Sequence, residues 1–128
     1  MNALLGEVVS FDEADAISLV RVKTALGDFS VLMLNFSKSL CAKKGGEVEL
    51  LFKENELSLA LKGAKTSVDN SFESKIISID KGKMLWQVFL ESNLSAIISA
   101  KAGETLNLRA NDEVVCFVKA DDIIIKVL

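Results

Sequence analysis

Few side chains in this sequence could do chemistry, and their types point away from catalysis. The chain contains no histidine and no tyrosine, so the commonest general acid–base side chain is absent. It has no glycine-rich phosphate-binding loop of the P-loop or dinucleotide kind. The acidic turn Asp12-Glu13-Ala14-Asp15 lacks the spacing and the closing glutamate of an EF-hand, so we interpret it as a solvated turn. These residues predict a protein that is not an enzyme and that holds no metal cation.

The two cysteines, Cys41 and Cys116, do not fall at equivalent positions of the repeat described below. Cys116 lies inside the apolar run 114–118. In a cytosolic chain this placement favours a buried thiol that packs as a small hydrophobe over a reactive or paired one.

Charge and hydropathy exclude two classes of partner. The formal net charge is −3 and the isoelectric point is about 5.0, which disfavours binding to a phosphate backbone and hence to nucleic acid. No apolar run reaches the roughly 18 residues of a membrane span. The N-terminal residues lack the basic segment and apolar core of a secretion signal. We therefore expect a cytoplasmic protein without a membrane span.

The sequence repeats itself once. Residues 2–11 match residues 70–79 without a gap, and both copies begin at an asparagine. The closing strands match as well, and there Lys53 falls on Lys119. A single duplication of this kind predicts a tandem pair of domains rather than a solenoid.

The apolar pattern places five strands in each copy. We expect them at residues 4–11, 17–24, 29–34, 47–52 and 57–61, and again at 72–79, 84–90, 94–99, 113–118 and 123–127. A helical turn is expected at 37–44, and a connector through Gly103 takes its place in the second copy. The prediction is an all-β fold of two tandem five-stranded small barrels of the OB type, with a short helical turn before the fourth strand.

The expected domain limits are 1–62 and 70–128, joined by a polar linker at 63–69. Each domain has only about 60 residues, which is close to the lower limit for an isolated core. The two domains should therefore depend on each other or on other chains. Exchange of strands between the halves or between chains would protect the sheet edges, so a homo-oligomer is expected.

Three segments of the second half resemble the Mop, or TOBE, domain family. They are Ser67-Val-Asp-Asn70 running into the strand 72–79, Ser95-Ala-Ile-Ile-Ser99, and Val118-Lys-Ala-Asp-Asp-Ile123. The first half is similar in weaker form, with Asn2, Gly6, Ser30 and Phe52-Lys53 in the matching places. The whole chain thus resembles the di-Mop, or molbindin-like, arrangement of two tandem domains.

The resemblance implies a cytoplasmic protein that binds molybdate or tungstate for storage or homeostasis, without catalysis or an organic cofactor. It also implies closed oligomers with sites at domain interfaces. A tetrahedral dianion requires several hydrogen-bond donors and some positive potential. Carried over from the family, the candidate oxyanion-binding residues are Lys119, Ala120, Ser95, Ser99 and Ser67 in the second half, and Lys53 and Ser30 in the first.

The chain also departs from the family pattern. Asp121 stands where the family has a serine, and Glu54 follows Lys53 in the first half. A carboxylate near a bound dianion repels it unless the side chain points away. These departures favour an alternative: an interaction or regulatory module that has lost anion binding and acts through a protein partner of molybdenum transport or regulation. The residues do not distinguish molybdate from tungstate, or storage from regulation.

Overall fold

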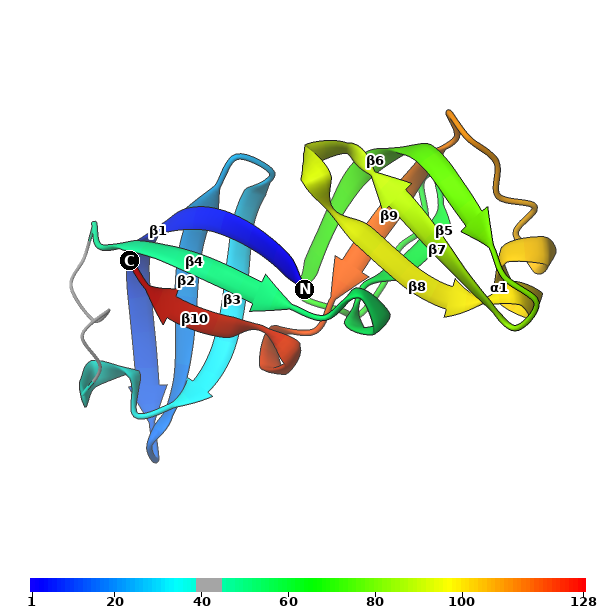
Figure 1. The fold of residues 1–128 in the computed structure, drawn as a ribbon. Helices are drawn as coiled ribbons and strands as arrows, with labels where there is room; N and C mark the ends of the chain where they lie inside the picture. The colour runs from blue at the N-terminus through cyan, green and yellow to red at the C-terminus, as the bar shows by residue number, and fades with distance from the viewer. Residues whose placement is uncertain (39–44) are drawn as a thin grey trace.

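The computed structural model describes residues 1–38 and 45–128. This part of the chain is mostly β, with two five-stranded antiparallel sheets and one short α-helix. Figure 1 shows the two sheets side by side, with the N-terminal residue at their junction. The predicted β class and the two five-stranded units are confirmed.

Each sheet is a meander of three strands, and two further strands extend it on the side of the first meander strand. In the first sheet the order is β10 (Ile124–Val127), β4 (Glu47–Phe52), β1 (Asn2–Ala14), β2 (Ile17–Thr24) and β3 (Gly27–Leu34). In the second sheet it is β5 (Ser58–Leu61), β9 (Glu113–Val118), β6 (Asn70–Lys81), β7 (Leu85–Leu90) and β8 (Ser95–Ser99). The same order of elements in both sheets is the structural form of the sequence repeat.

The two halves exchange their fifth strands. β5 follows β4 along the chain but pairs with β9, with Ser58 opposite Phe117. β10 follows β9 but pairs with β4, with Ile124 opposite Leu51. The strand pattern had placed both fifth strands within their own halves, and that detail is wrong. The exchange covers the edges of β4 and β9, as sheet-edge protection requires.

Helical segments are short. The helix α1 (Ala100–Thr105) occupies the connector before the fourth strand of the second half. Single 3-10 turns form η1 (Phe36–Lys38), η2 (Glu54–Glu56), η3 (Glu91–Asn93) and η4 (Ala120–Asp122). The helical turn predicted at 37–44 coincides with the described residues only in η1, and residues 39–44 lie outside them. Among residues 1–38 and 45–128, no helix is long and apolar enough to cross a membrane.

The acidic turn predicted at 12–15 begins later than expected. β1 continues through Ala14, and Asp15 and Ala16 make the turn with positive φ. Arg21 Nη1 donates a hydrogen bond to Asp12 from the neighbouring strand at 2.9 Å. This contact and the β1–β2 ladder extend the strand into the acidic segment.

Glu13 ties the end of β1 to the start of η1. Its carboxylate accepts hydrogen bonds from Ser18 Oγ at 2.7 Å and from Ser37 Oγ and N at 2.9 and 3.2 Å. These bonds, that of Ser18 first, hold the pKa of Glu13 below its ordinary value of 4.5. Because the folded-state pKa is depressed, the resulting stability is present above that ordinary value and is lost as the pH falls through the folded pKa.

We expect Glu13→Gln to lower the melting temperature at pH 7 and to lose that effect under acid conditions. The glutamine amide is neutral, so it cannot provide the charge-assisted bonds of the carboxylate. Thermal melts of both proteins between pH 7 and pH 3 would measure the difference. A difference that stays constant over this range would contradict the assignment.

One apolar core runs through both halves. The rings of Phe29 in the first sheet and Phe72 in the second have centroids 5.8 Å apart, and both side chains are buried. Cys116 is fully buried, and burial raises the pKa of its thiol to about 12. The interpretation of Cys116 as a buried thiol is confirmed, whereas Cys41 lies outside the described residues.

Gly103 lets α1 lie directly against the indole of Trp86. Both residues are buried, and a methyl group at Gly103 would overlap atoms of the Trp86 ring. We expect Gly103→Ala to lower the free energy of unfolding by about 1–3 kcal/mol, as overpacking does in other cores. Urea denaturation would measure this loss. In a Trp86→Leu background the same change should cost much less, and an equal cost in both backgrounds would place the strain elsewhere.

Candidate functional site

A buried asparagine at the start of β1 joins the first half to the second. The Asn2 side chain is 3% exposed. Its Nδ2 donates to the carbonyl oxygen of Ser95 at 2.9 Å, and its Oδ1 accepts the Ser95 N–H at 2.9 Å. The carboxamide thus satisfies both main-chain groups of Ser95 at the beginning of β8.

The second half makes the same contact in return. Asn70, at the start of β6, is 1% exposed. Its Nδ2 donates to the carbonyl oxygen of Ser30 at 2.8 Å, and its Oδ1 accepts the Ser30 N–H at 2.7 Å. Ser30 lies in β3, so each half holds one serine of the other half at a fixed position.

The two matched lysines lie next to these asparagine contacts. Lys53 follows Phe52, which is opposite Asn2 in the β1–β4 ladder. The turn η2, which begins after Lys53, packs beside β8. Ser95 at the start of β8 is therefore near this turn. We call Asn2, Lys53, Glu54 and Ser95 the first cluster.

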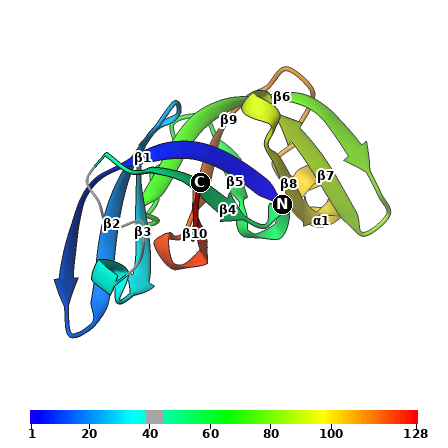
Figure 2. The ribbon, with the colours of Figure 1, turned by 60° about the vertical axis from the view of Figure 1, so that its left-hand side comes forward.

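The second cluster has the same construction. Lys119 follows Val118, which is opposite Asn70 in the β6–β9 ladder. The turn η4, which begins after Lys119, packs beside β3, where Ser30 lies. We call Ser30, Asn70, Lys119 and Ala120 the second cluster. Figure 1 and Figure 2 both show η2 and η4 at the junction of the two halves.

The structure groups the predicted residues differently from the sequence. Lys119 was expected to act with Ser95, because both belong to the second half. Instead, Lys119 and Ala120 lie with Ser30, and Lys53 lies with Ser95. Each cluster draws residues from both halves, as the asparagine contacts require.

Two predicted serines lie outside these groups. Ser99 is at the far end of β8 from Ser95, which is roughly 13 Å for four residues of extended strand. Its hydroxyl accepts the Ala102 N–H at 3.0 Å and so caps α1. Ser67 lies in an exposed bend three residues before Asn70, close to the second cluster along the chain.

Both turns that follow the lysines contain carboxylates. Glu54 Oε1 lies 2.7 Å from the amino nitrogen of Met1, and this hydrogen bond lowers the pKa of Glu54. Partial burial raises the pKa of Asp122, and the nearby carboxylates of Glu56 and Asp121 raise it further. Glu56 belongs to η2 and Asp122 to η4, so each lysine turn carries carboxylates.

Sequence reasoning missed the role of the two asparagines. Asn2 and Asn70 served to align the repeat and to support the family resemblance, yet they are the buried residues that position Ser95 and Ser30. The signal was present: a polar residue of the same type begins both copies immediately before an apolar strand. A buried amide needs partners for its donors and acceptors, so a contact of this kind could be expected.

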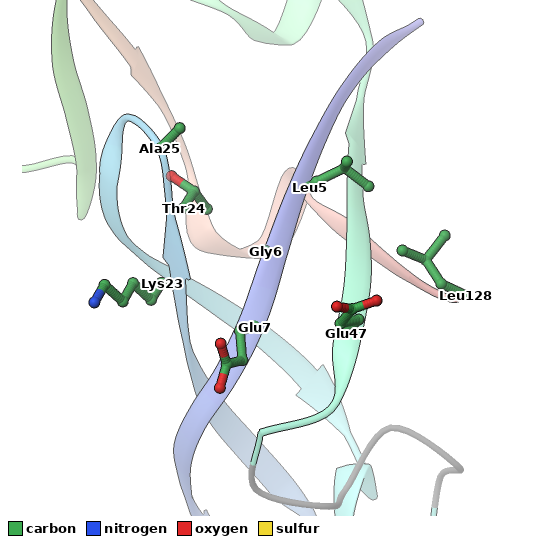
Figure 3. Close-up of a pocket in the computed structure, with 8 residues that line it drawn as sticks. All are labelled: Leu5, Gly6, Glu7, Lys23, Thr24, Ala25, Glu47 and Leu128. Atoms are coloured by element: carbon green, nitrogen blue, oxygen red, sulfur yellow. The ribbon is translucent and has the colours of Figure 1, made fainter.

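A separate hollow of about 460 Å³ opens beside the first sheet (Figure 3). It is lined by Leu5, Gly6, Glu7, Lys23, Thr24, Ala25, Glu47 and Leu128. Glu7 and Glu47 are directly opposite each other in the β1–β4 ladder, and Lys23 is opposite Glu7 on the other side. With two carboxylates and one ammonium in its lining, this hollow is a poor site for an anion.

No family model matches the sequence, and no curated protein matches it. Among solved structures, a crystal structure of the cytoplasmic molybdate-binding protein ModG with molybdate bound matches the fold with a TM-score of 0.89. The match covers 99% of this chain and 96% of that chain at 21% sequence identity. This chain has the fold of ModG. The tandem resemblance drawn from the repeat is thereby confirmed for the fold, and both clusters lie within the part shared with ModG.

Proposed function

We propose that this protein binds molybdate or tungstate in the cytoplasm, as a store or buffer, and catalyses no reaction. The observation that carries the proposal is the doubled cluster, in which an asparagine-held serine of one half meets the lysine turn of the other half. The match to ModG, which was determined with molybdate bound, supports the choice of ligand.

The residues of the second cluster fit a tetrahedral dianion. The Lys119 ammonium supplies positive charge, and the Ser30 hydroxyl supplies a donor on a strand whose main chain is already held by Asn70. Main-chain N–H groups at Ala120 and the hydroxyl of Ser67 are further proposed donors. Lys53 and Ser95 are their counterparts in the first cluster. Ser99 lies at the other end of β8, beside α1, and we propose it as an oxyanion-binding residue only there, apart from the two clusters.

We further propose that the sheets close into OB-type barrels with domain limits at 1–62 and 70–128 and a linker at 63–69, although β5 and β10 cross between them. A homo-oligomer is supported by the large apolar side chains that stay exposed. Those more than half exposed are Met1, Leu5, Leu34, Leu61, Ile77, Met84, Leu85, Ile124 and Leu128. Self-association would remove part of this surface from water.

Native mass spectrometry with micromolar molybdate, tungstate and sulfate tests the proposal directly. We expect whole-number uptake of molybdate or tungstate with rejection of sulfate, and the same spectra report the oligomer. An oligomer that takes up none of these anions would contradict oxyanion binding.

That negative outcome would favour the second candidate function. Glu54, Glu56, Asp121 and Asp122 place four carboxylates in the two lysine turns. If they exclude anions from both clusters, the protein is an interaction or regulatory module that acts through a protein partner.

A further inference from the structure

The two clusters differ at the residue that follows the lysine. This residue is Glu54 in the first cluster and Ala120 in the second. Both lysines are extended, with φ and ψ of −74° and 153° at Lys53 and of −69° and 145° at Lys119, and both are followed by a 3-10 turn. The backbone therefore presents the side chains of Glu54 and Ala120 from equivalent positions.

The Glu54 carboxylate reaches the start of β1. Its contact with the Met1 nitrogen at 2.7 Å places it beside the residue that precedes Asn2, and the side chain is only 22% exposed. The neighbouring Glu56 occupies another hydrogen-bond donor of this cluster: its Oε1 accepts the Lys53 N–H at 2.7 Å. The first cluster thus already holds carboxylate oxygens of its own chain.

The second cluster has a buried methyl group at the same position. Ala120 is 6% exposed and carries no charge. Asp121, the next residue, is exposed to solvent and corresponds to Asn55 in the first cluster. Lys119 is therefore not followed by a carboxylate at the position that Glu54 occupies after Lys53.

We propose that the two clusters are functionally unequal: the second cluster takes the oxyanion, whereas the Glu54 carboxylate occupies the anion position of the first cluster and excludes the ligand. This inference rests on the proposed function. A carboxylate accepts hydrogen bonds from the same donors as an oxyanion and repels a dianion at short range. Glu54 and Ala120 are thus the residues that decide which cluster binds.

A reciprocal exchange of the two residues tests this proposal. In native mass spectra with molybdate, Glu54→Ala should take up one more molybdate per chain than the unchanged protein. Ala120→Glu should take up one fewer. Glu104→Ala is the matched control, because it makes the same change in net charge at an exposed position of α1 and should leave the count unchanged.

Ala120 is buried, so a variant of similar size separates charge from bulk. Ala120→Gln introduces nearly the same volume as Ala120→Glu without the charge, and thermal melts of both report whether the fold survives. Loss of molybdate in the glutamate variant, with retention in a folded glutamine variant, supports exclusion by charge.

The outcomes separate the inference from the function on which it rests. If the unchanged protein binds molybdate and Glu54→Ala gains none, the inequality of the clusters is wrong and oxyanion binding stands. If neither protein takes up molybdate, the proposed function itself fails, and the inference fails with it.

Discussion

Truncation of the chain after Asp122 is expected to unfold both sheets together. The cut removes β10, which pairs with β4 over residues 48–51, and it removes the buried side chain of Ile123. The edge of β4 would then be exposed, and the core that spans both halves would lose a buried member. We expect the intact protein to unfold in one cooperative transition and the truncated protein to show none, as measured by circular dichroism and by the dispersion of amide signals in NMR spectra.

Removal of Leu128 alone provides the control. This side chain is 61% exposed and follows the last residue of β10, so its loss should leave the transition in place. A truncated protein in which the second sheet stays folded while the first melts would show that the halves are independent, which would contradict the expectation.

Asn70→Ala should be the most damaging single substitution outside the apolar core. The change leaves the N–H and the carbonyl oxygen of Ser30 without their partners at 2.7 and 2.8 Å. Each buried polar group left unpaired costs about 1–3 kcal/mol, so for the two groups we expect a loss of about 2–6 kcal/mol in the free energy of unfolding. Chemical denaturation would measure it.

The repeat supplies both a second test and a control. Asn2→Ala removes the equivalent pair of bonds to Ser95 and should cost about as much. Asn55→Ala changes an exposed asparagine in η2 and should stay within about 0.5 kcal/mol of the unchanged protein. A small effect at Asn70 and Asn2 alike would mean that solvent or a shifted strand replaces the lost contacts.

The strand pattern predicted the number of strands but not the partners of the fifth. Residues 57–61 and 123–127 both have large apolar residues at their first, third and fifth positions, and both follow a lysine and an acidic turn. Alternation along a strand says which face is buried, but it does not say which of two equivalent edges the strand joins. Because the halves are repeats, pairing within a half and pairing with the other half look alike in the sequence. Strand exchange could therefore be predicted only as one of two alternatives.

The candidate site shows the same limit. Lys53, Lys119, Ser30 and Ser95 were all identified from the sequence, but they were grouped by half. The grouping changes because η4 packs beside β3 and η2 beside β8, which are contacts across the junction of the halves. Ser99 illustrates a different limit, since a serine at a strand end is also a strong helix N-cap, and its hydroxyl binds Ala102.

The strand exchange also has a consequence for biosynthesis. The first sheet cannot be completed until residues 124–127 have been made, although β4 ends at Phe52. At roughly 5–20 residues per second, the edge of β4 waits several seconds for β10. During that interval the outer edge of β4 stays open, and β5 has no partner until β9 has been made. Both are then exposed to pairing with strands of other chains.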